Sequence, residues 1–389
     1  MKNPPQTPSV ALVHDALREY GGAERVLEAL HALYPDAPVY VSYLDKNGLG
    51  KHAARFSGWD IRESWLARVP FLAKNISPFR FLAPLVWKSI DLSAFDIVIT
   101  SSGWFIPRGV TLGKNTRHVC YLHHPPRNLY GYATGSTYQK HAVVRLYATV
   151  INYFLRQYDY SSAQTVDTMI ANSKETARRA WKFYRKHSVV IYPPVDVPKK
   201  PLLLSKDTKK LLGSLGVAPG TYYLSVSRLS WAKRVDVAIG ACNKNNVPLV
   251  VVGAGKEEAP LRTLAGPSIH FAGPVSDAQL DTLYRNAKAL LFCALDEDFG
   301  MVPVEAMGRG TPVIALAEGG IKETVVEGKT GVLFGNPTVE SLADALVRFE
   351  KSFSPTWKKQ CVRWAQQFSG RVFARRIRAV IRGADTFSL

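Results

Sequence analysis

Cysteine is scarce in this sequence, and no two cysteines have a metal-binding spacing. The 389 residues include four cysteines, of which Cys120 and Cys293 stand within apolar runs. The spacing argues against a disulfide framework and against a zinc centre. We therefore expect buried free thiols, which suit a reducing cytoplasm.

Long hydrophobic runs are also missing. No segment approaches the roughly 20 apolar residues that a membrane-spanning helix requires. The N-terminal segment, MKNPPQTPSVALVHDA, is too rich in proline and too short in apolar length for a signal peptide. These absences predict a cytoplasmic protein.

Acidic residues are outnumbered by basic ones. The chain has 50 lysines and arginines against 31 aspartates and glutamates, a formal charge of +19. Such an excess suits an anionic partner, namely nucleic acid, anionic lipid or a phosphorylated substrate.

Several well-known catalytic and binding motifs are absent as well. There is no Ser-His-Asp order, Walker loop or HExxH, so proteolysis and enzymatic phosphoryl transfer are poorly supported. No helix-turn-helix, zinc finger or RNP-like motif occurs, so we predict no nucleic-acid partner despite the charge.

What is present is a regular alternation of short apolar runs with amphipathic stretches of helical length. Buried strands that alternate with helices indicate parallel sheets covered on both faces, the doubly wound α/β class. The expected strands are Val10–His14, Val39–Ser42, Ile97–Thr100, Val119–Leu122, Met169–Asn172, Val189–Tyr192, Tyr222–Val226, Leu249–Val252, Ile269–Phe271, Ala289–Phe292, Val313–Ala315 and Val332–Phe334. The expected helices include Ala23–Leu33, Lys174–Tyr184, Val235–Asn243, Ala278–Asn286 and Pro303–Arg309.

The length of the chain exceeds what one hydrophobic core usually organises, so two domains are expected. The break follows YPPVD, where the Pro/Lys-rich stretch 198–201 has neither a helix nor a strand period. We predict domains over 1–197 and 198–365. A helical tail over 366–389 follows an interruption at Ser369-Gly370.

In open parallel sheets, ligands bind beyond the carboxyl ends of the strands, and four motifs fall there. The strongest is EDFGMVPVEAM, which runs from the strand ending at Phe292 into a helix expected to start near Pro303. Glu297 and Glu305 would face one ligand and accept hydrogen bonds from sugar or ribose hydroxyls. Amides at the helix start would bind a phosphate or hydroxyls. The donor-binding residues expected here are Phe299, Gly300, Met301 and Val302.

Two alternatives apply to this acidic segment. The two glutamates could serve only to stabilise the start of the helix through its dipole. Asp296-Glu297-Asp298 could be a DxD metal site, but no histidine or further acidic cluster completes a coordination shell, so we expect no metal.

The second motif, SVSRLSWAKR, follows the first strand of the second half. Arg228 and Lys233 are five residues apart across a loop-to-helix junction, a spacing suited to clamping a diphosphate leaving group. The alternative is a solvated surface pair.

The remaining motifs are weaker. Gly21 and Gly22 open a helix after the first strand without a GxGxxG pattern, so a nicotinamide cofactor is not supported, and a tight turn is the alternative. Gly253 lies in a similar turn near the expected nucleotide base. His123 could contact substrate, although a loop histidine is often structural. The acceptor-side residues expected around it are His124 and Arg127.

Together these motifs resemble the retaining GT-B glycosyltransferases of family 4 over essentially the whole chain. The matching segments are GGAER at 21–25, ANS at 171–173, YPPVD at 192–196, SRLSxxKR at 227–234, the Glu-x7-Glu element at 297–305 and GGIKETV at 319–325. The resemblance implies a GT-B fold, in which two Rossmann-like domains face a cleft. Residues 1–197 would bind the acceptor and 198–365 the nucleotide sugar, and the final helix would cross back to the first domain.

The resemblance also implies roles for single residues. Arg228 and Lys233 would neutralise the donor diphosphate, Glu297 would hold hydroxyls of the transferred sugar, and Glu305 would hold the ribose. His123 would contact the sugar near its reacting carbon. Gly22 would approach the diphosphate or, with Gly21, the acceptor. No metal or other cofactor is implied, and the leaving phosphate itself would take the acceptor's proton.

Within the family, HDAL, GGAERVLEAL and the ETV ending resemble bacterial polysaccharide mannosyltransferases. This implies transfer of mannose from GDP-mannose to a lipid-linked or saccharide acceptor. The alternatives are a UDP-sugar donor or, from another class, a catalytically silent GT-B scaffold. The intact Arg228, Lys233, Glu297 and Glu305 argue against the scaffold.

Between Lys51 and Lys88, cations alternate with large aromatic residues, which suits a surface lying on an anionic bilayer. The alternative is that the aromatics are core and the cations solvated. The cations are Arg55, Arg62, Arg68, Lys74 and Arg80, and the aromatics are Trp59, Trp65, Phe71, Phe79, Phe81 and Trp87. The sequence thus predicts peripheral association with the inner face of the cytoplasmic membrane.

Overall fold

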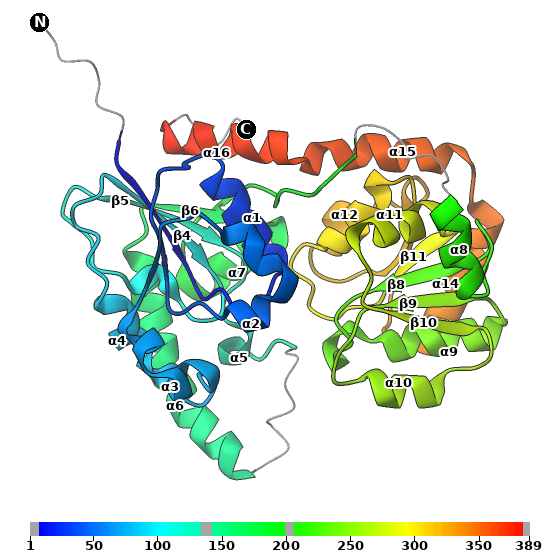
Figure 1. The fold of residues 1–389 in the computed structure, drawn as a ribbon, viewed down its shortest axis with the longest axis horizontal. Helices are drawn as coiled ribbons and strands as arrows, with labels where there is room; N and C mark the ends of the chain where they lie inside the picture. The colour runs from blue at the N-terminus through cyan, green and yellow to red at the C-terminus, as the bar shows by residue number, and fades with distance from the viewer. Residues whose placement is uncertain (1–7, 134–141, 199–205, 384–389) are drawn as a thin grey trace, which may run out of the picture. The chain divides into compact units, whose positions relative to one another are not determined.

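The computed structural model describes residues 8–133, 142–198 and 206–383, which form two compact units. The first unit holds the described residues up to Pro194 except Ala133, and it takes up the chain again from Gly370. The second unit runs from Val195 to Ser369. Figure 1 shows a sheet flanked by helices in each unit. The hinge expected at 198–201 lies outside the described residues from 199 onward.

The first unit is built on a seven-stranded sheet of parallel strands in the order β3-β2-β1-β4-β5-β6-β7. The direction in which strands are added reverses between β1 and β4, so the carboxyl ends of these two strands form a topological switch point. The strands are β1 Val10–His14, β2 Val39–Val41, β3 Ile61–Glu63, β4 Ile97–Ser102, β5 Arg117–Leu122, β6 Thr168–Ala171 and β7 Val189–Val190.

Helices cover both faces of this sheet because the strand residues are apolar on both sides. Leu12 of β1 packs in a cluster with α1 and α16, whereas its neighbours Ala11 and Val13 pack in a second cluster with α4. The helices are α1 Gly22–His31, α2 Lys46–Leu49, α3 Pro70–Lys74, α4 Ala83–Lys88, α5 Arg127–Tyr130, α6 Ala142–Gln164, α7 Lys174–Tyr184 and α16 Gly370–Ile381.

A buried ion pair fixes the long helix α6 to the segment that follows β4. The guanidinium of Arg108 contacts the carboxylate of Asp159, and both side chains are fully buried. Tyr130 donates a hydrogen bond of 2.7 Å to the second carboxylate oxygen of Asp159. Each buried charge therefore has a counter-charge, although Nε of Arg108 is buried without a hydrogen-bond partner.

The second unit has a six-stranded parallel sheet in the order β10-β9-β8-β11-β12-β13, and its switch point lies between β8 and β11. The strands are β8 Tyr223–Val226, β9 Leu249–Val252, β10 Ile269–Gly273, β11 Ala289–Phe292, β12 Val313–Leu316 and β13 Gly331–Phe334. The helices are α8 Lys206–Ser214, α9 Val235–Asn245, α10 Glu258–Leu264, α11 Asp277–Asn286, α12 Met301–Gly308, α13 Ile321–Thr324, α14 Val339–Ser352 and α15 Thr356–Ala365. On one face, α9 and α14 bury the largest cluster of the unit.

Every strand expected from the sequence is present, with ends that differ by at most two residues, and the doubly wound α/β class is confirmed. The missed strand is β3, whose residues Ile61–Glu63 are half-buried or exposed and so give no apolar run. The helix expected to start near Pro303 begins at Met301 instead, which makes Pro303 the third helical residue. Glu305 accordingly lies in the second turn, not the first.

The thiols match the expectation from the sequence, and the tail has the expected interruption at Ser369-Gly370. All four cysteines are free and buried. The tail is interrupted at Ser369, after which α16 inserts Phe373 and Ile377 into the core of the first unit. No helix among the described residues is long and apolar enough to cross a membrane.

Candidate functional site

The two strongest sequence motifs meet at the switch point of the second unit. Arg228 and Lys233 follow β8, and Glu297 follows β11, the neighbouring strand. The ammonium of Lys233 lies 2.7 Å from a carboxylate oxygen of Glu297, and their side chains are 30% and 17% exposed. The two loops are joined by their backbones, because the Leu295 amide donates to the Ala232 carbonyl at 2.9 Å. Half-burial strengthens this pair relative to a surface pair while leaving it open to a ligand.

The N-terminus of α12 adjoins this pair in sequence. Gly300 caps the helix with φ of +89°, a conformation that favours glycine, and a Cβ there would lie 2.5 Å from the Ile321 side chain. The backbone therefore turns sharply into the helix and places Met301 and Val302 in its first turn. Amides in a first helical turn lack intrahelical acceptors and favour anions or hydroxyls. Phe299, the residue before Gly300, is buried, and its ring packs edge-on against that of Phe368.

Glu305 is buried on α12, and its carboxylate accepts a hydrogen bond of 3.1 Å from the hydroxyl of Tyr284 on α11. Sequence reasoning missed Tyr284, because a tyrosine on a helical face reads as core. Of the two glutamates, Glu297 forms an ion pair with Lys233, whereas Glu305 is hydrogen-bonded by a neutral hydroxyl.

Gly253 has a structural reason to be glycine. Its φ is +124°, and a Cβ would lie 2.0 Å from the carbonyl oxygen of Ser227 in the loop after β8. Gly319 is similar, since a Cβ there would lie 2.1 Å from the Glu297 carbonyl oxygen. These glycines let neighbouring loops pack by their backbones and so set the positions of Arg228 and Glu297.

The first unit also gathers polar side chains at its switch point. His14 ends β1, Ser101 is its direct partner on β4, and His123 follows β5. The Ser101 hydroxyl lies 3.0 Å from Nδ1 of His14 and 2.8 Å from Nε2 of His123. Nε2 of His14 lies 3.4 Å from the carboxylate of Glu24 on α1. All four side chains are buried, so the contacts form one continuous chain in a protected place.

Burial shapes the protonation of two members of this chain. Burial lowers the pKa of His123 well below its usual value, and the nearby His14 and His124 lower it further. Burial alone would raise the pKa of Glu24, but the hydrogen bond and charge of His14 and backbone amides leave that pKa lowered. His123 is therefore neutral and Glu24 ionised at neutral pH.

Asp15 lies beside this chain, directly after β1. Its carboxylate accepts from the Phe105 amide at 3.2 Å, and a Cβ on Gly103 would approach it to 3.1 Å. Burial raises the pKa of Asp15, although the nearby His14 and backbone amides oppose the effect. His124 is half-buried, with Nδ1 3.0 Å from the Pro125 carbonyl oxygen, and approaches Gly103 through its other nitrogen.

The glycines of the GGAER loop differ from those of the second unit. Gly21 has an extended backbone, and a Cβ there would meet only the Glu24 carboxylate, at the ordinary distance of 3.4 Å. Gly22 is exposed at the start of α1. The fold thus does not require glycine at residue 21, which favours close approach of a ligand over the tight-turn alternative. Arg127 is half-buried at the start of α5.

Sequence reasoning singled out His123 but missed its partners His14, Ser101 and Glu24. The available signal was the His14-Asp15 pair at a predicted strand end. Ser101 gave no signal, because its contact depends on the strand order.

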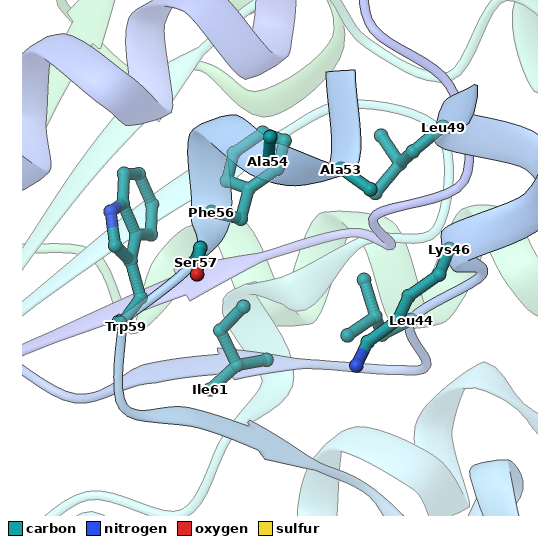
Figure 2. A pocket seen from close by; sticks show the side chains of 10 residues that line it. Leu44, Lys46, Leu49, Ala53, Ala54, Phe56, Ser57, Trp59 and Ile61 are labelled. Carbon is teal, nitrogen blue, oxygen red and sulfur yellow. The ribbon is translucent and has the colours of Figure 1, made fainter. Parts of the chain in front are cut away.

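A pocket on the first unit, drawn in Figure 2, lies apart from these residues. It is lined mainly by apolar side chains such as Leu49, Phe56 and Ile61, with Lys46 as its charged lining residue. Trp59, which also lines it, stacks on His31 of α1 at 3.7 Å between ring centroids. No predicted site residue lines it.

Metal ligands do not cluster in the part of the chain that the structure describes. Across residues 8–133, 142–198 and 206–383, no group of three or more His, Cys, Asp or Glu side chains is placed to hold a metal ion.

Solved structures share the fold over nearly the whole chain. HepE of Anabaena in complex with UDP-glucose matches 96% of this chain and 99% of its own, with a TM-score of 0.70 and 20% identity. WaaG, a glycosyltransferase involved in lipopolysaccharide biosynthesis, matches 96% of this chain and 100% of its own, with a TM-score of 0.64 and 16% identity.

Curated relatives are similar over part of the chain. The α-1,3/1,6-mannosyltransferase ALG2 of Candida glabrata is 28% identical over 41% of this chain and 44% of its own length. The D-inositol 3-phosphate glycosyltransferase of Actinosynnema mirum is 31% identical over 47% of this chain and 48% of its own. The chain spans about half the length of these relatives.

Two models of protein families match consecutive parts of the chain. "Glycosyltransferase Family 4" matches residues 20–199, and "Glycosyl transferases group 1" matches residues 216–367. The match boundary lies close to the boundary between the two structural units at Pro194 and Val195. The chain therefore belongs to the GT-B glycosyltransferases, with a family 4 domain followed by a group 1 domain.

Proposed function

We propose that this glycosyltransferase retains anomeric configuration and transfers a hexose, with mannose from GDP-mannose as the favoured donor. The proposed acceptor is lipid-linked or a saccharide, in cell-surface polysaccharide or glycolipid assembly. The observation that carries the proposal is the pair of Lys233 and Glu297 at the β8/β11 switch point, ahead of the α12 N-terminus. In the proposal, the cation serves the diphosphate and the neighbouring carboxylate serves the sugar hydroxyls.

In this proposal the second unit binds the nucleotide sugar. Lys233 and Arg228 stabilise the diphosphate as negative charge develops on it in the transition state. Amides of the first turn of α12 bind the same oxygens or the sugar, Glu297 accepts from the sugar hydroxyls, and Glu305 accepts from the ribose. The departing phosphate takes the acceptor's proton, so no metal, other cofactor or protein nucleophile is required.

The first unit supplies the acceptor side. His123 contacts the sugar near its reacting carbon, and Gly21 and Gly22 allow the acceptor or the diphosphate to approach α1. His124 and Arg127 border the acceptor.

A UDP-sugar is the alternative donor. It is supported by the fold shared with HepE, whose structures hold UDP and UDP-glucose, whereas the name of ALG2 supports mannose. From another class, a silent scaffold of the same fold would lack donor turnover. The Lys233–Glu297 pair argues for catalysis through its place, because it stands beyond the carboxyl ends of β8 and β11 at the switch point, where ligands bind in such sheets.

The first test is thermal stability of the full chain with GDP, UDP, ADP and dTDP, each without added metal. A nucleotide at 100 times its dissociation constant should add about 2.7 kcal/mol. Selective stabilisation by GDP supports mannose, and by UDP the alternative. Stabilisation by none of them contradicts the donor site. The anomer of the product by NMR then tests retention, and unchanged turnover in EDTA tests metal independence.

We further propose that the first unit works at an anionic membrane, as a peripheral protein on the inner face of the cytoplasmic membrane. The segment between Lys51 and Lys88, in which cations alternate with aromatic residues, supports this only in part. Trp87 is core and Arg80 is buried against Asn152, so both leave the predicted surface. Arg62 is paired with Asp60. Only the backbone of Lys74 lies within the described part of the chain.

A better-supported surface joins this segment to α6. Most exposed large apolar side chains of the described residues come from 69–85 and 143–154, and Phe71, Leu146 and Phe154 are 67%, 69% and 64% exposed. Tyr147 of α6 donates a hydrogen bond to the Pro78 carbonyl, so the two segments adjoin. Neither 64–90 nor 142–158 contains an acidic residue, whereas Arg68, Lys88 and Arg145 lie in them.

Such a surface fits an anionic bilayer better than a second copy of itself, because two all-cationic faces would repel. Flotation with anionic vesicles should fall for the double variant Leu146→Asp/Phe154→Asp but not for Leu264→Asp, which changes an exposed leucine of the second unit (53% exposed). The proposal would be contradicted if the double variant floated with anionic vesicles as well as Leu264→Asp does, or if the protein floated equally with anionic and neutral vesicles.

A further inference from the structure

The buried chain of Glu24, His14, Ser101 and His123 contains one hydroxyl between two imidazole rings. The distances from Ser101 Oγ are 3.0 Å to His14 and 2.8 Å to His123, so both are hydrogen bonds. A hydroxyl has a single hydrogen. Ser101 can therefore donate to one ring only and must accept from the other.

The carboxylate of Glu24 decides in which direction the hydrogen bonds through His14 and Ser101 run. Glu24 is ionised and can only accept, so Nε2 of His14 carries the hydrogen. When His14 is neutral, its Nδ1 is a lone pair that accepts from Ser101. Ser101 then accepts from Nε2–H of His123. Because His123 is neutral, its proton is on Nε2 and its Nδ1 is an acceptor.

We propose that Glu24, His14 and Ser101 are positioning residues that fix the tautomer of His123. They present Nδ1 of His123 to the donor sugar as a hydrogen-bond acceptor for a hydroxyl. This inference rests on the proposed contact between His123 and the sugar. Within the described part of the chain, Nδ1 of His123 has no hydrogen-bond partner of its own, which leaves it for a ligand.

The direction of the hydrogen bonds between His14, Ser101 and His123 can reverse if His14 gains a proton. A charged His14 donates from both nitrogens, so Ser101 accepts from Nδ1–H of His14 and its own hydrogen becomes available to Nε2 of His123. His123 is then no longer held in the Nε2–H tautomer, and its Nδ1 can carry the hydrogen. The charged or titratable groups facing His14 are Glu24 on α1, Asp15 after β1, and His123 after β5.

The tautomer is measured directly by two-bond ¹⁵N–¹H correlation spectra of the full chain labelled at histidine, with His123 assigned by its loss in His123→Gln. We expect the Nε2–H form in the wild type at neutral pH, and a mixture of tautomers in Ser101→Ala. Ser162→Ala removes a buried hydroxyl that touches no histidine and should leave the spectrum unchanged. An Nδ1–H form in the wild type, or an unchanged His123 in Ser101→Ala, would overturn the proposal.

Donor turnover provides the second readout. Loss of an orienting partner typically costs roughly 10- to 100-fold, which we expect in kcat/KM for Ser101→Ala. If the spectra show the fixed tautomer while no nucleotide sugar is turned over, the proposed function fails and the tautomer assignment stands.

Discussion

Replacing Glu297 by glutamine should change nucleotide binding and turnover in opposite directions. In the free protein, Glu297 is paired with Lys233 at 2.7 Å. When a diphosphate binds, the carboxylate repels it and also competes for the lysine. When a nucleotide sugar binds, the same carboxylate accepts hydrogen bonds from sugar hydroxyls. Glu297→Gln therefore removes a penalty on the diphosphate and an attraction for the sugar.

The magnitudes follow from the charges and their exposure. Two like charges about 8 Å apart repel by about 2 kcal/mol at an effective dielectric constant near 20. Because the pair is partly exposed, we discount this by about half, to roughly 1 kcal/mol or fivefold tighter binding of the free nucleotide. Loss of a charged hydrogen-bond acceptor for the sugar costs about 1.5–3 kcal/mol, so kcat/KM should fall roughly 10- to 150-fold.

Lys233→Met should have the opposite effect on nucleotide affinity to Glu297→Gln. It removes a charge-assisted hydrogen bond to the diphosphate, so nucleotide affinity should fall roughly 10- to 150-fold. Lys288→Met is a control, because Lys288 is about as exposed as Lys233 and forms an ion pair with Glu350 in the same unit. Isothermal titration with the stabilising nucleotide, on both single variants, the double variant and the control, measures all four affinities.

Equal weakening of nucleotide binding by Glu297→Gln and Lys233→Met would contradict this prediction. Glu297 would then be a support for the lysine and not a sugar ligand. Unchanged affinity in Lys233→Met would remove the lysine from the diphosphate site altogether.

Three further predictions concern the scaffold. Asp159→Asn leaves Arg108 buried without a counter-charge and should cost about 3–5 kcal/mol in urea unfolding, and a loss under 1 kcal/mol would contradict the role of the pair. Gly253→Ala should lower stability by about 1–3 kcal/mol because of its positive φ and the Ser227 carbonyl, whereas Gly21→Ala should leave the melting temperature unchanged and reduce turnover. Burial lowers the pKa of His118 from 6.5 to about 4, so the unfolded chain takes up the proton first. Stability should then fall by about 3 kcal/mol as pH drops from about 6.5 to 4, and His118→Gln should flatten that dependence.

The fold was predictable because its buried strands appear in the sequence as short apolar runs. Val10–His14, Leu249–Val252 and Ala289–Phe292 have the expected ends, since each is apolar on both faces. The residues of β3 are half-buried or exposed, so this strand gives no apolar run in the sequence. The start of α12 is set by the left-handed Gly300 and not by Pro303. Local propensity decides an element's existence better than its ends.

The site was predictable only motif by motif. Arg228, Lys233 and Glu297 could each be placed at a strand end, but their meeting depends on β8 pairing with β11, a long-range contact that no local pattern encodes. The same holds for His14 and Ser101, which are brought together by the pairing of β1 with β4. In both units the polar contacts form at the reversal of strand order, where the loops after the two central strands lie side by side.

Glycine shows most clearly what the sequence alone leaves open. Gly21 and Gly253 both stand in short turns after a first or second strand, and each had a functional and a structural interpretation. The space where a Cβ would go separates them. At Gly253 it is filled by the backbone of the neighbouring loop, so the fold itself requires glycine. At Gly21 only a flexible carboxylate borders it, at 3.4 Å, and the backbone is extended, so any residue would fit the empty protein. A glycine that the protein does not need for itself points to something that approaches from outside, which is why Gly21 belongs with the proposed acceptor side and Gly253 with the frame that positions Arg228.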